Sequence, residues 1–440
     1  MWERGGLRLT PAMALVAVLL VPSIARANVE PRATMGGDQP ISGVKGVKDE
    51  RLPAVAYNAA NRMFLVVRED ERNTQWLGID IFGRLVNDDG KPQGADFRVS
   101  GGVSNTNERH PAVAWNQADN QFLVVWADDR EETKYGVKIW GRLLAGDGTP
   151  LGPNFRIGSG VSNQSYPAVA WNKKLNQYLV VWQDHRNFAQ HGADIYGRRL
   201  MADGTRLGTA DTRISEHEPG VDQKNHEYTP DVAWSSVSWS YLVVWADIES
   251  GSGSGWDIHG RMVRGNGTFP GEEFRICGAE ATADDVWPAV AFNAKENRFL
   301  VVWMDMRRAA TRGLDIYAQQ VTGNGAPIDN EIRVSANNAT GDEAVPDVAW
   351  NATNNRYLVV WDDNRNSGAG RGTDTFGQYL ARVGGKIGDN FRVSGPGAVK
   401  EEVDPAIAWG KGKNRFLVVR GDARDYKSRG YDIYGRWVDG

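Results

Sequence analysis

Acidic side chains recur at one fixed place in this sequence, three residues before a regularly spaced proline. Seven prolines have such a position, and only Gln164 breaks the rule that a carboxylate occupies it. Hard divalent cations take several oxygen ligands, so a ring of these groups around a central opening would form a Ca²⁺ site. Pairing with arginines of nearby loops is the simpler interpretation, because no D-x-D-x-D-G loop accompanies them. The six carboxylates are Glu50, Glu108, Glu227, Asp285, Glu343 and Glu402.

A second recurrent feature is an aspartate followed two residues later by an arginine. We expect the aspartate to cap its own turn and the arginine to make charge-assisted hydrogen bonds to a neighbouring loop. Asp247 is the exception, because Glu249 stands where the arginine is expected. The six pairs are Asp70/Arg72, Asp128/Arg130, Asp184/Arg186, Asp305/Arg307, Asp363/Arg365 and Asp422/Arg424.

The residue immediately before each proline varies freely, in contrast to its surroundings. Function is expected where the symmetry of a repeat breaks. Tyr166 and Trp287 offer flat apolar faces for a sugar ring or a partner's side chain, and His110 and Asp404 offer hydrogen bonds. The alternative is that these side chains only fill a central channel. The seven residues are Leu52, His110, Tyr166, Thr229, Trp287, Val345 and Asp404.

The fourth repeat departs most from the others. The loop before Pro230 is the longest of its kind and carries His217, His226 and Tyr228. The next loop, "ESGSGSGW", is rich in Gly and Ser, and Trp239 replaces a turn residue that is usually Asn. Gly/Ser loops beside aromatic residues are typical of recognition loops. Insertion without function is an equally simple explanation.

Catalytic motifs are weak in this chain. It contains no G-x-S-x-G elbow, no phosphate-binding loop and no zinc-binding motif. Paired acids for glycoside hydrolysis or lyase chemistry could arise among the recurrent carboxylates, but their separation is not encoded in the sequence. The sequence therefore favours a protein without catalytic activity and leaves an enzyme as the alternative.

These residues are positioned by a unit that repeats seven times. Its template is P-[AD]-[VI]-A-[WYF], a polar turn, [FY]-L-V-V-[WR]-x-D, a variable loop, D-I-Y-G-R, a Gly turn and F-R-[VI]-S. Successive opening prolines are 58, 56, 63, 58, 58 and 59 residues apart. These prolines are Pro53, Pro111, Pro167, Pro230, Pro288, Pro346 and Pro405.

Each unit contains four β-type runs separated by Asn, Asp and Gly, and no segment has the periodicity of an amphipathic helix. Four strands per repeat predict an all-β fold, a single seven-bladed β-propeller. The run "FLVVW" at 122–126 is apolar at every position, as a sheet covered on both faces requires. "PAVAW" alternates Ala with larger residues, which suits the crowded innermost strand.

The last unit lacks its fourth strand, since the chain ends at "RGYDIYGRWVDG". At the other end, "QPIS" finishes 11 residues before Pro53, the same spacing that separates "FRVS" from Pro111. We therefore expect residues 39–42 to pair with the strand at 431–438 and close the ring, which removes exposed sheet edges. The predicted division is a signal peptide at 1–27, an N-terminal tail at 28–38 and the propeller at 39–440.

The N-terminus predicts export. Arg4 and Arg8 precede an apolar run at 12–21, and "ARA" at 25–27 offers a cleavage site. That run is too short to span a membrane. Removing three Arg and one Glu changes the net charge from −4 to −6, which argues against a nucleic-acid partner. The single cysteine, Cys277, excludes an internal disulfide and is expected to be a small buried residue.

The sequence resembles secreted bacterial β-propeller proteins built of "PAVAWN…YLVVWxD…DIYGR…FRVS" repeats, quoted from 166–200 and its equivalents. The resemblance implies a scaffold and no particular activity. We hypothesise a secreted binding module, extracellular or periplasmic, for a carbohydrate or an extracellular protein on the loop face. A polysaccharide lyase or hydrolase acting in the central funnel, and a structural subunit of an extracellular assembly, are the alternatives. Ca²⁺ is the one cofactor considered.

Overall fold

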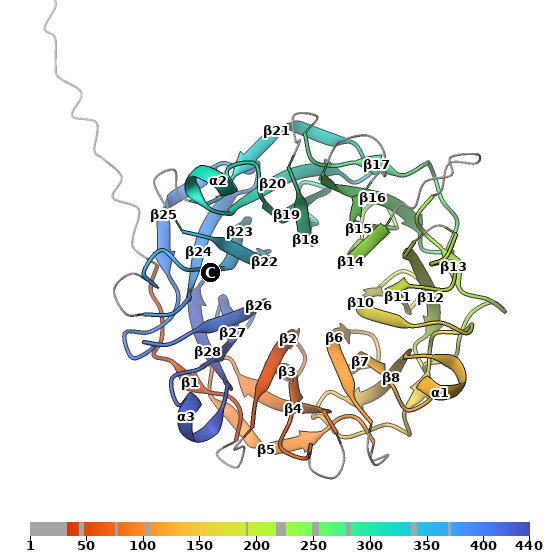
Figure 1. The fold of residues 1–440 in the computed structure, drawn as a ribbon, viewed down its shortest axis with the longest axis horizontal. Helices are drawn as coiled ribbons and strands as arrows, with labels where there is room; N and C mark the ends of the chain where they lie inside the picture. Colours follow the sequence, from red (N-terminus) through yellow and green to blue (C-terminus); the bar gives the residue numbers. More distant parts are fainter. Residues whose placement is uncertain are drawn as a thin grey trace, which may run out of the picture. The chain divides into compact units, whose positions relative to one another are not determined.

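Twenty-eight strands and three one-turn helices make up the described part of the chain. The computed structural model describes residues 33–43, 48–74, 78–101, 106–190, 192–216, 226–248, 255–278, 283–335, 341–367 and 371–440. The predicted signal peptide and the first residues of the predicted tail lie outside these ranges. Within them, the strands form seven four-stranded antiparallel sheets arranged as blades around a central axis (Figure 1).

The first strand of each blade lies next to the axis (Figure 1). Its alternating small residues let seven strands converge there, as the sequence predicts. These inner strands are β2 (Glu50–Asn58), β6 (Glu108–Asn116), β10 (Gln164–Asn172), β14 (His226–Ser235), β18 (Asp285–Asn293), β22 (Glu343–Asn351) and β26 (Glu402–Gly410).

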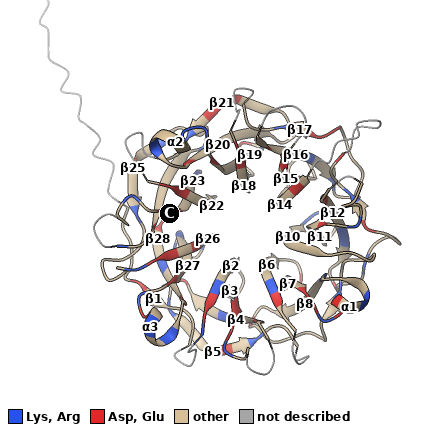
Figure 2. Ribbon diagram, in the orientation of Figure 1, with Lys and Arg blue, Asp and Glu red and all other residues tan. Residues whose placement is uncertain are grey.

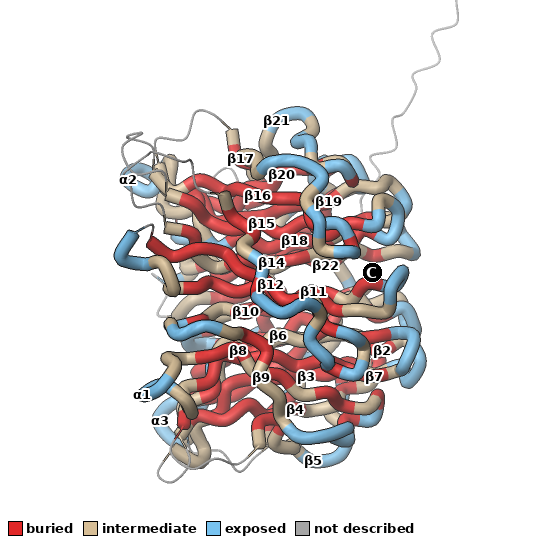
Figure 3. Tube along the Cα trace, turned by 90° about the vertical axis from the view of Figure 1, so that its right-hand side faces the viewer, coloured by how far each residue is buried: buried red, intermediate tan, exposed pale blue. Residues whose placement is uncertain are grey.

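The second strands carry the core. They are buried over almost their whole length because each is covered by a neighbouring blade on both faces (Figure 3). Leu123, Val124, Val125 and Trp126, for example, have no exposed surface, so the continuous apolar run has the role that the sequence predicts. These strands are β3 (Met63–Asp70), β7 (Gln121–Asp128), β11 (Gln177–Asp184), β15 (Ser240–Ile248), β19 (Arg298–Asp305), β23 (Arg356–Asp363) and β27 (Arg415–Asp422).

The third and fourth strands complete each blade toward the outside. The third strands are β4 (Asp80–Asn87), β8 (Lys138–Ala145), β12 (Asp194–Met201), β16 (Trp256–Arg264), β20 (Asp315–Thr322), β24 (Asp374–Ala381) and β28 (Asp432–Asp439). The fourth strands are β5 (Pro92–Arg98), β9 (Phe155–Arg156), β13 (Thr212–Arg213), β17 (Phe274–Arg275), β21 (Pro327–Arg333), β25 (Lys386–Arg392) and β1 (Gln39–Pro40).

Three short helices, which the strand patterns do not predict, lie in loops between second and third strands. They are α1 (Glu132–Tyr135), α2 (Ala309–Arg312) and α3 (Tyr426–Arg429). Each has four residues and no buried side chain, so none could produce an amphipathic pattern in the sequence. We number the blades 1 to 7 from β2, so that blade 4 is β14 to β17 and blade 7 is β26 to β28 with β1.

The ring closes between the two ends of the chain, as predicted. Gln39 pairs with Gly435 and Pro40 with Tyr434, so β1 is the outer strand of blade 7. The hydroxyl of Ser42 accepts a hydrogen bond from the backbone N–H of Ile433 at 3.0 Å. Each blade therefore has four strands, and blade 7 is assembled from sequence positions almost 400 residues apart.

Candidate ligand-binding site at the channel mouth

A β-bulge at the recurrent proline shapes the innermost strand of every blade. On β2, Arg51 lies opposite Glu69 and Ala54 opposite Val67, so two residues, Leu52 and Pro53, oppose one on β3. Proline tolerates this position because a bulge does not require its missing N–H. Bulges redirect side chains, and this one turns the residue before the proline toward the channel. The same register shift occurs on the other six inner strands.

The bulge holds the residue before each proline in the left-handed region of backbone conformation. Their φ angles run from 48° to 56°, although none of the seven is Gly. Two, Thr229 and Val345, are β-branched, for which this conformation is most strained. Strain kept in all seven blades indicates a backbone imposed by the ring rather than by any one side chain.

All seven residues line one cavity of about 490 Å³ at the centre of the ring, together with the prolines and the residues that follow them. The sequence-based placement of this set near the channel is therefore correct. Figure 2 shows charged residues of both signs along the inner strands, but those that line the cavity are the acids Asp231, Asp347 and Asp404. The seven residues before the prolines differ in chemistry, so the cavity is asymmetric although the fold around it has nearly seven-fold symmetry.

Aromatic rings gather on one side of this cavity. The rings of His110 and Tyr166 stack with centroids 4.0 Å apart, and Trp287 meets Tyr166 edge to face at 5.9 Å. Trp287 is 38% exposed, so part of its face is open to solvent. Burial lowers the pKa of His110 to about 4, which keeps its imidazole neutral at neutral pH. The mouth thus combines a flat apolar surface with a neutral hydrogen-bonding ring.

Carboxylates behind the mouth hold two of the ring residues in place. The backbone N–H of His110 donates to Glu69 Oε1 at 2.7 Å, and that of Asp404 donates to Asp362 Oδ2 at 3.0 Å. Burial raises the pKa of Glu69 to about 7 and raises that of Asp404, against the attraction of Arg51. Sequence reasoning missed Glu69 and Asp362, which occupy the variable position of the [WR]-x-D motif.

Two further carboxylates lie on the channel wall below the mouth. Asp231 and Asp347 follow the proline in blades 4 and 6, where the other five blades have Ala. Each accepts two backbone N–H groups: Asp347 those of Val348 at 2.7 Å and Ile407 at 2.8 Å. Burial raises the pKa of Asp231 to about 6 and, with repulsion from Asp231, that of Asp347 to about 7. The [AD] alternation in the template was the only sequence signal for them.

A second aromatic strip runs outward from the mouth between blades 3 and 4. The ring centroids of His185 and Phe188 are 5.0 Å apart, those of Phe188 and His226 5.4 Å, and those of His226 and Tyr228 5.8 Å. Trp256 extends the strip at 5.1 Å from Tyr228. The predicted candidates His226 and Tyr228 therefore lie together, but in this strip rather than in the central cavity. His217 lies outside the described residues.

A pocket of about 320 Å³ between blades 2 and 3 adjoins the mouth. His110 lines both this pocket and the central cavity, and His185 and Gln183 line its other side. Arg109 also borders the pocket, with half of its side chain exposed. The two hollows together give an extended surface rather than a single small-molecule pocket.

The six recurrent carboxylates do not form a ring at the channel mouth, which was the less favoured of the two interpretations of the sequence; Glu50 and Glu343, for example, pair with arginines as the favoured one predicts. Each is buried inside its own blade, opposite the aspartate that ends the second strand, as Glu50 is opposite Asp70. Burial, followed by repulsion from that aspartate, raises the pKa of Glu343 to about 8 and that of Glu108 to about 8. Of the described residues, no possible metal-ligand group contains two of the six. The geometry therefore gives no support to a shared Ca²⁺ ring.

The Asp/Arg pairs are structural, as predicted. Asp70 Oδ1 accepts the backbone N–H of Arg72 at 3.0 Å and so caps its own turn. The guanidinium of Arg72 then binds Glu50 at 3.0 Å and Asp96 on β5 at 3.0 Å. The arginine thus joins strands of its own blade, whereas the sequence suggested a neighbouring loop. The acids and arginines compensate each other inside each of the six blades that have such a pair.

Two other residues singled out from the sequence lie away from the mouth. Trp239 is 54% exposed in the turn between β14 and β15, at the opposite end of these strands from His226. Cys277 is buried, and burial raises the pKa of its thiol, as expected for a structural residue. No helix in the described ranges is long and apolar enough to cross a membrane.

Comparison with known proteins supports the fold. No protein family model and no curated protein matches the sequence. An ulvan lyase of polysaccharide lyase family PL25 superposes with a TM-score of 0.55 at 11% identity, over 89% of this chain and 94% of that one. For the polysaccharide lyase Uly1 the values are 0.54 and 8%, over 88% and 89%. For the GH93 α-L-arabinofuranosidase of Fusarium graminearum, in complex with arabinobiose, they are 0.50 and 12%, over 78% and 97%.

Proposed function

We propose that this protein binds an extracellular polysaccharide at the mouth of its central channel. The observation that carries the proposal is the aromatic group formed by His110, Tyr166 and Trp287 at the edge of the 490 Å³ cavity. Aromatic faces bind the apolar faces of sugar rings, and nearby polar groups fix their orientation.

Polar groups around the mouth suit a sugar chain. Asp404 lies on the cavity wall, and the partly exposed side chains of Arg51 and Arg109 belong to the residues next to Leu52 and His110 of the mouth. Arginine binds carboxylate and sulfate groups through two parallel N–H donors. The adjoining pocket and the outer strip provide length for several sugar units. The solved structures of similar fold include two polysaccharide lyases, which is consistent with a polysaccharide ligand.

Calorimetric titration with a panel of neutral and anionic polysaccharides tests the proposal. Tyr166→Ala and Trp287→Ala should each weaken binding at least about tenfold, or about 1.4 kcal/mol. Trp239→Ala is the matched control, since it removes an exposed tryptophan from the opposite face. Equal affinity of the wild type and both mouth variants would exclude the mouth as the site. If no glycan binds, and a protein ligand binds the wild type but not the Tyr166→Ala and Trp287→Ala variants, the protein-binding alternative is supported.

An enzyme is the second candidate, and one observation favours it. Asp231 and Asp347 line the channel with pKa values raised to about 6 and about 7, a range suited to general acid and base catalysis. Incubation with the same polysaccharides, followed by detection of unsaturated products and of new reducing ends, distinguishes lyase, hydrolase and binding module. Product formation that is lost in Asp347→Asn would establish catalysis.

We propose further that the protein is exported, with residues 1–27 as a cleaved signal peptide. N-terminal sequencing of the protein recovered outside the cytoplasm should begin close to residue 28. Recovery of the intact Met1 terminus from the cytoplasm alone would contradict this. We also propose a relationship to secreted propellers with the same repeat, on the basis of the PAVAWN, YLVVWxD, DIYGR and FRVS motifs.

A further inference from the structure

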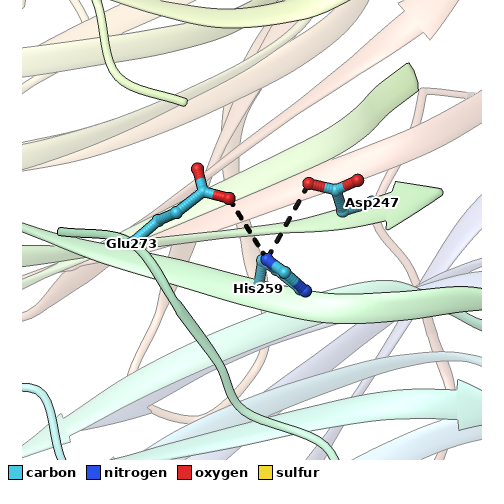
Figure 4. A group of neighbouring side chains, drawn as sticks. All are labelled: Asp247, His259 and Glu273. Atoms are coloured by element: carbon cyan, nitrogen blue, oxygen red, sulfur yellow. Dashed lines mark hydrogen bonds and ion pairs between the residues drawn. The ribbon is translucent and has the colours of Figure 1, made fainter. Parts of the chain in front are cut away.

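A histidine between two carboxylates distinguishes blade 4. Asp247 is the last but one residue of β15, His259 lies on β16, and Glu273 immediately precedes β17 (Figure 4). His259 Nδ1 is 3.4 Å from Glu273 Oε1 and 3.8 Å from Asp247 Oδ2. The Asp247 and His259 side chains are under one-tenth exposed, and that of Glu273 is 19% exposed. Three potential ligand atoms therefore converge in a largely buried place.

The other blades hold an arginine at this place. In blade 3, Arg186 is 2.6 Å from Asp184 and 2.8 Å from Asp211, and its guanidinium lies 3.9 Å from the ring centroid of Tyr196. Asp184 and Asp211 correspond to Asp247 and Glu273 of blade 4. Blades 1, 5 and 7 repeat the arrangement with Arg72, Arg307 and Arg424, each between two carboxylates and over an aromatic ring.

Blade 4 has lost both the arginine and the aromatic ring beneath it. The sequence places Glu249 at the arginine position, which lies outside the described residues, and His259 at the position of the aromatic ring. The two carboxylates are retained. In four other blades, an arginine guanidinium bridges the two corresponding carboxylates. In blade 4, the sequence has the acid Glu249 in place of that arginine.

We propose that blade 4 binds a divalent cation of the zinc class through Asp247 Oδ2, His259 Nδ1 and Glu273 Oε1. Imidazole nitrogen with carboxylate oxygen is a ligand set suited to zinc. Tetrahedral zinc with ligands at about 2.1 Å has ligand atoms about 3.4 Å apart. The observed separations of 3.4 and 3.8 Å from His259 Nδ1 are close to that edge. All three ligand atoms lie within 4.8 Å of one another.

Neighbouring groups orient the two carboxylates for this role. The backbone N–H of Glu216 donates to Glu273 Oε2 at 2.7 Å, which leaves Oε1 directed toward His259. The indole N–H of Trp245 donates to Asp247 Oδ2 at 3.5 Å. Hydrogen bonds of this kind fix the orientation of the ligating side chains in metal sites. The cation would supply the positive charge that arginine supplies elsewhere, and three protein ligands leave a fourth position for water.

Zinc titration of the full-length mature protein, after removal of bound metal with a chelator, tests the proposal. Wild type should bind one Zn²⁺ per chain with a dissociation constant in the micromolar range or tighter, and its melting temperature should rise with metal. His259→Gln and Glu273→Gln should each weaken binding at least tenfold. Glu331→Gln is the matched control, because Glu331 is the equivalent carboxylate of blade 5 and pairs with Arg307 at 2.8 Å.

The outcomes separate cleanly. Stoichiometric binding that survives in Glu331→Gln and is lost in His259→Gln supports the site. No binding by wild type, or equal affinity in His259→Gln, overturns it and leaves His259 as a hydrogen-bonding replacement for arginine. Circular dichroism without metal shows whether each variant is folded. Titration of wild type with Co²⁺ needs no variant, since a nitrogen and oxygen ligand set gives visible absorption and its absence counts against the proposal.

Discussion

Replacing Asp347 by Ala should remove a pH-dependent loss of folding stability that this buried carboxyl causes. Ala is the residue that five other blades have at this position, so the backbone accommodates it. Burial and repulsion from Asp231 raise the pKa of Asp347 from 3.8 to about 7. A raised carboxyl pKa means that the folded state binds the proton more tightly than the unfolded state. Stability from this group is therefore present at low pH and falls as pH rises from about 4 to about 7.

The size of the effect follows from these two pKa values. Between pH 5 and pH 8, a shift from 3.8 to about 7 costs the folded protein about 2.6 kcal/mol. The channel side of Asp347 is partly hydrated, so we expect about 1 to 2.6 kcal/mol. Asp347→Ala also removes the acceptor for the N–H groups of Val348 and Ile407, at a cost of about 1 kcal/mol at either pH.

Urea unfolding of wild type and Asp347→Ala at pH 5 and pH 8 measures this difference. Between pH 5 and pH 8, the variant should gain about 1 to 2.6 kcal/mol of stability relative to wild type. Asp389→Ala, which removes an exposed aspartate, is the control and should show no such gain. Parallel pH profiles for wild type and Asp347→Ala would refute the assignment of a raised pKa to this carboxyl.

Three further predictions concern the ring and the blades. Val345→Gly should raise the free energy of unfolding by about 1 kcal/mol, because φ is 48° there and Gly adopts positive φ without strain. Ala344→Gly on the same strand should lower it. Destabilisation by both changes would show that the bulge is unstrained. Arg186→Met should cost about 3 kcal/mol, because buried Asp184 loses the guanidinium that pairs with it, while Asp211 keeps that of Arg198 at 2.8 Å. The exposed Arg206→Met should cost almost nothing, and equal melting temperatures of the two variants would count against the pairing. The imidazole resonances of His110 should titrate near 4 in an NMR pH series, and a midpoint near 6.5 would mean that its ring is solvated.

The architecture was predictable because the repeat encodes it several times over. Seven copies of the same strands leave one consistent arrangement, and the 11-residue spacing before Pro53 and Pro111 locates the closing strand. The one-turn helices could not be predicted, since four residues with no buried side chain carry no periodicity. The lengths of the fourth strands could not be predicted either. They vary from two residues at β9 to seven at β5, although these strands share the F-R motif.

The site was predictable in location and not in detail. Side chains two residues apart on a regular strand face the same way, so Glu50 and Leu52 would both have pointed at the channel. The bulge at Leu52 and Pro53 changes that alternation, so Leu52 lines the cavity while Glu50 stays inside the blade. A proline alone favours an extended residue before it and gives no indication of positive φ. Asp231 and Asp347 were visible only as a small variation after the proline.

The closure of blade 7 also sets a timetable for biogenesis. Gln39 finds its partner only when Gly435 has been made, about 400 residues later. At a synthesis rate of about 5 to 20 residues per second, β1 waits roughly 20 to 80 s with its hydrogen-bonding edge unmatched. Six blades can form during that interval, each from consecutive strands, while the seventh cannot. Completion of the ring is therefore a late, long-range event, and the first strand made is among the last to be used.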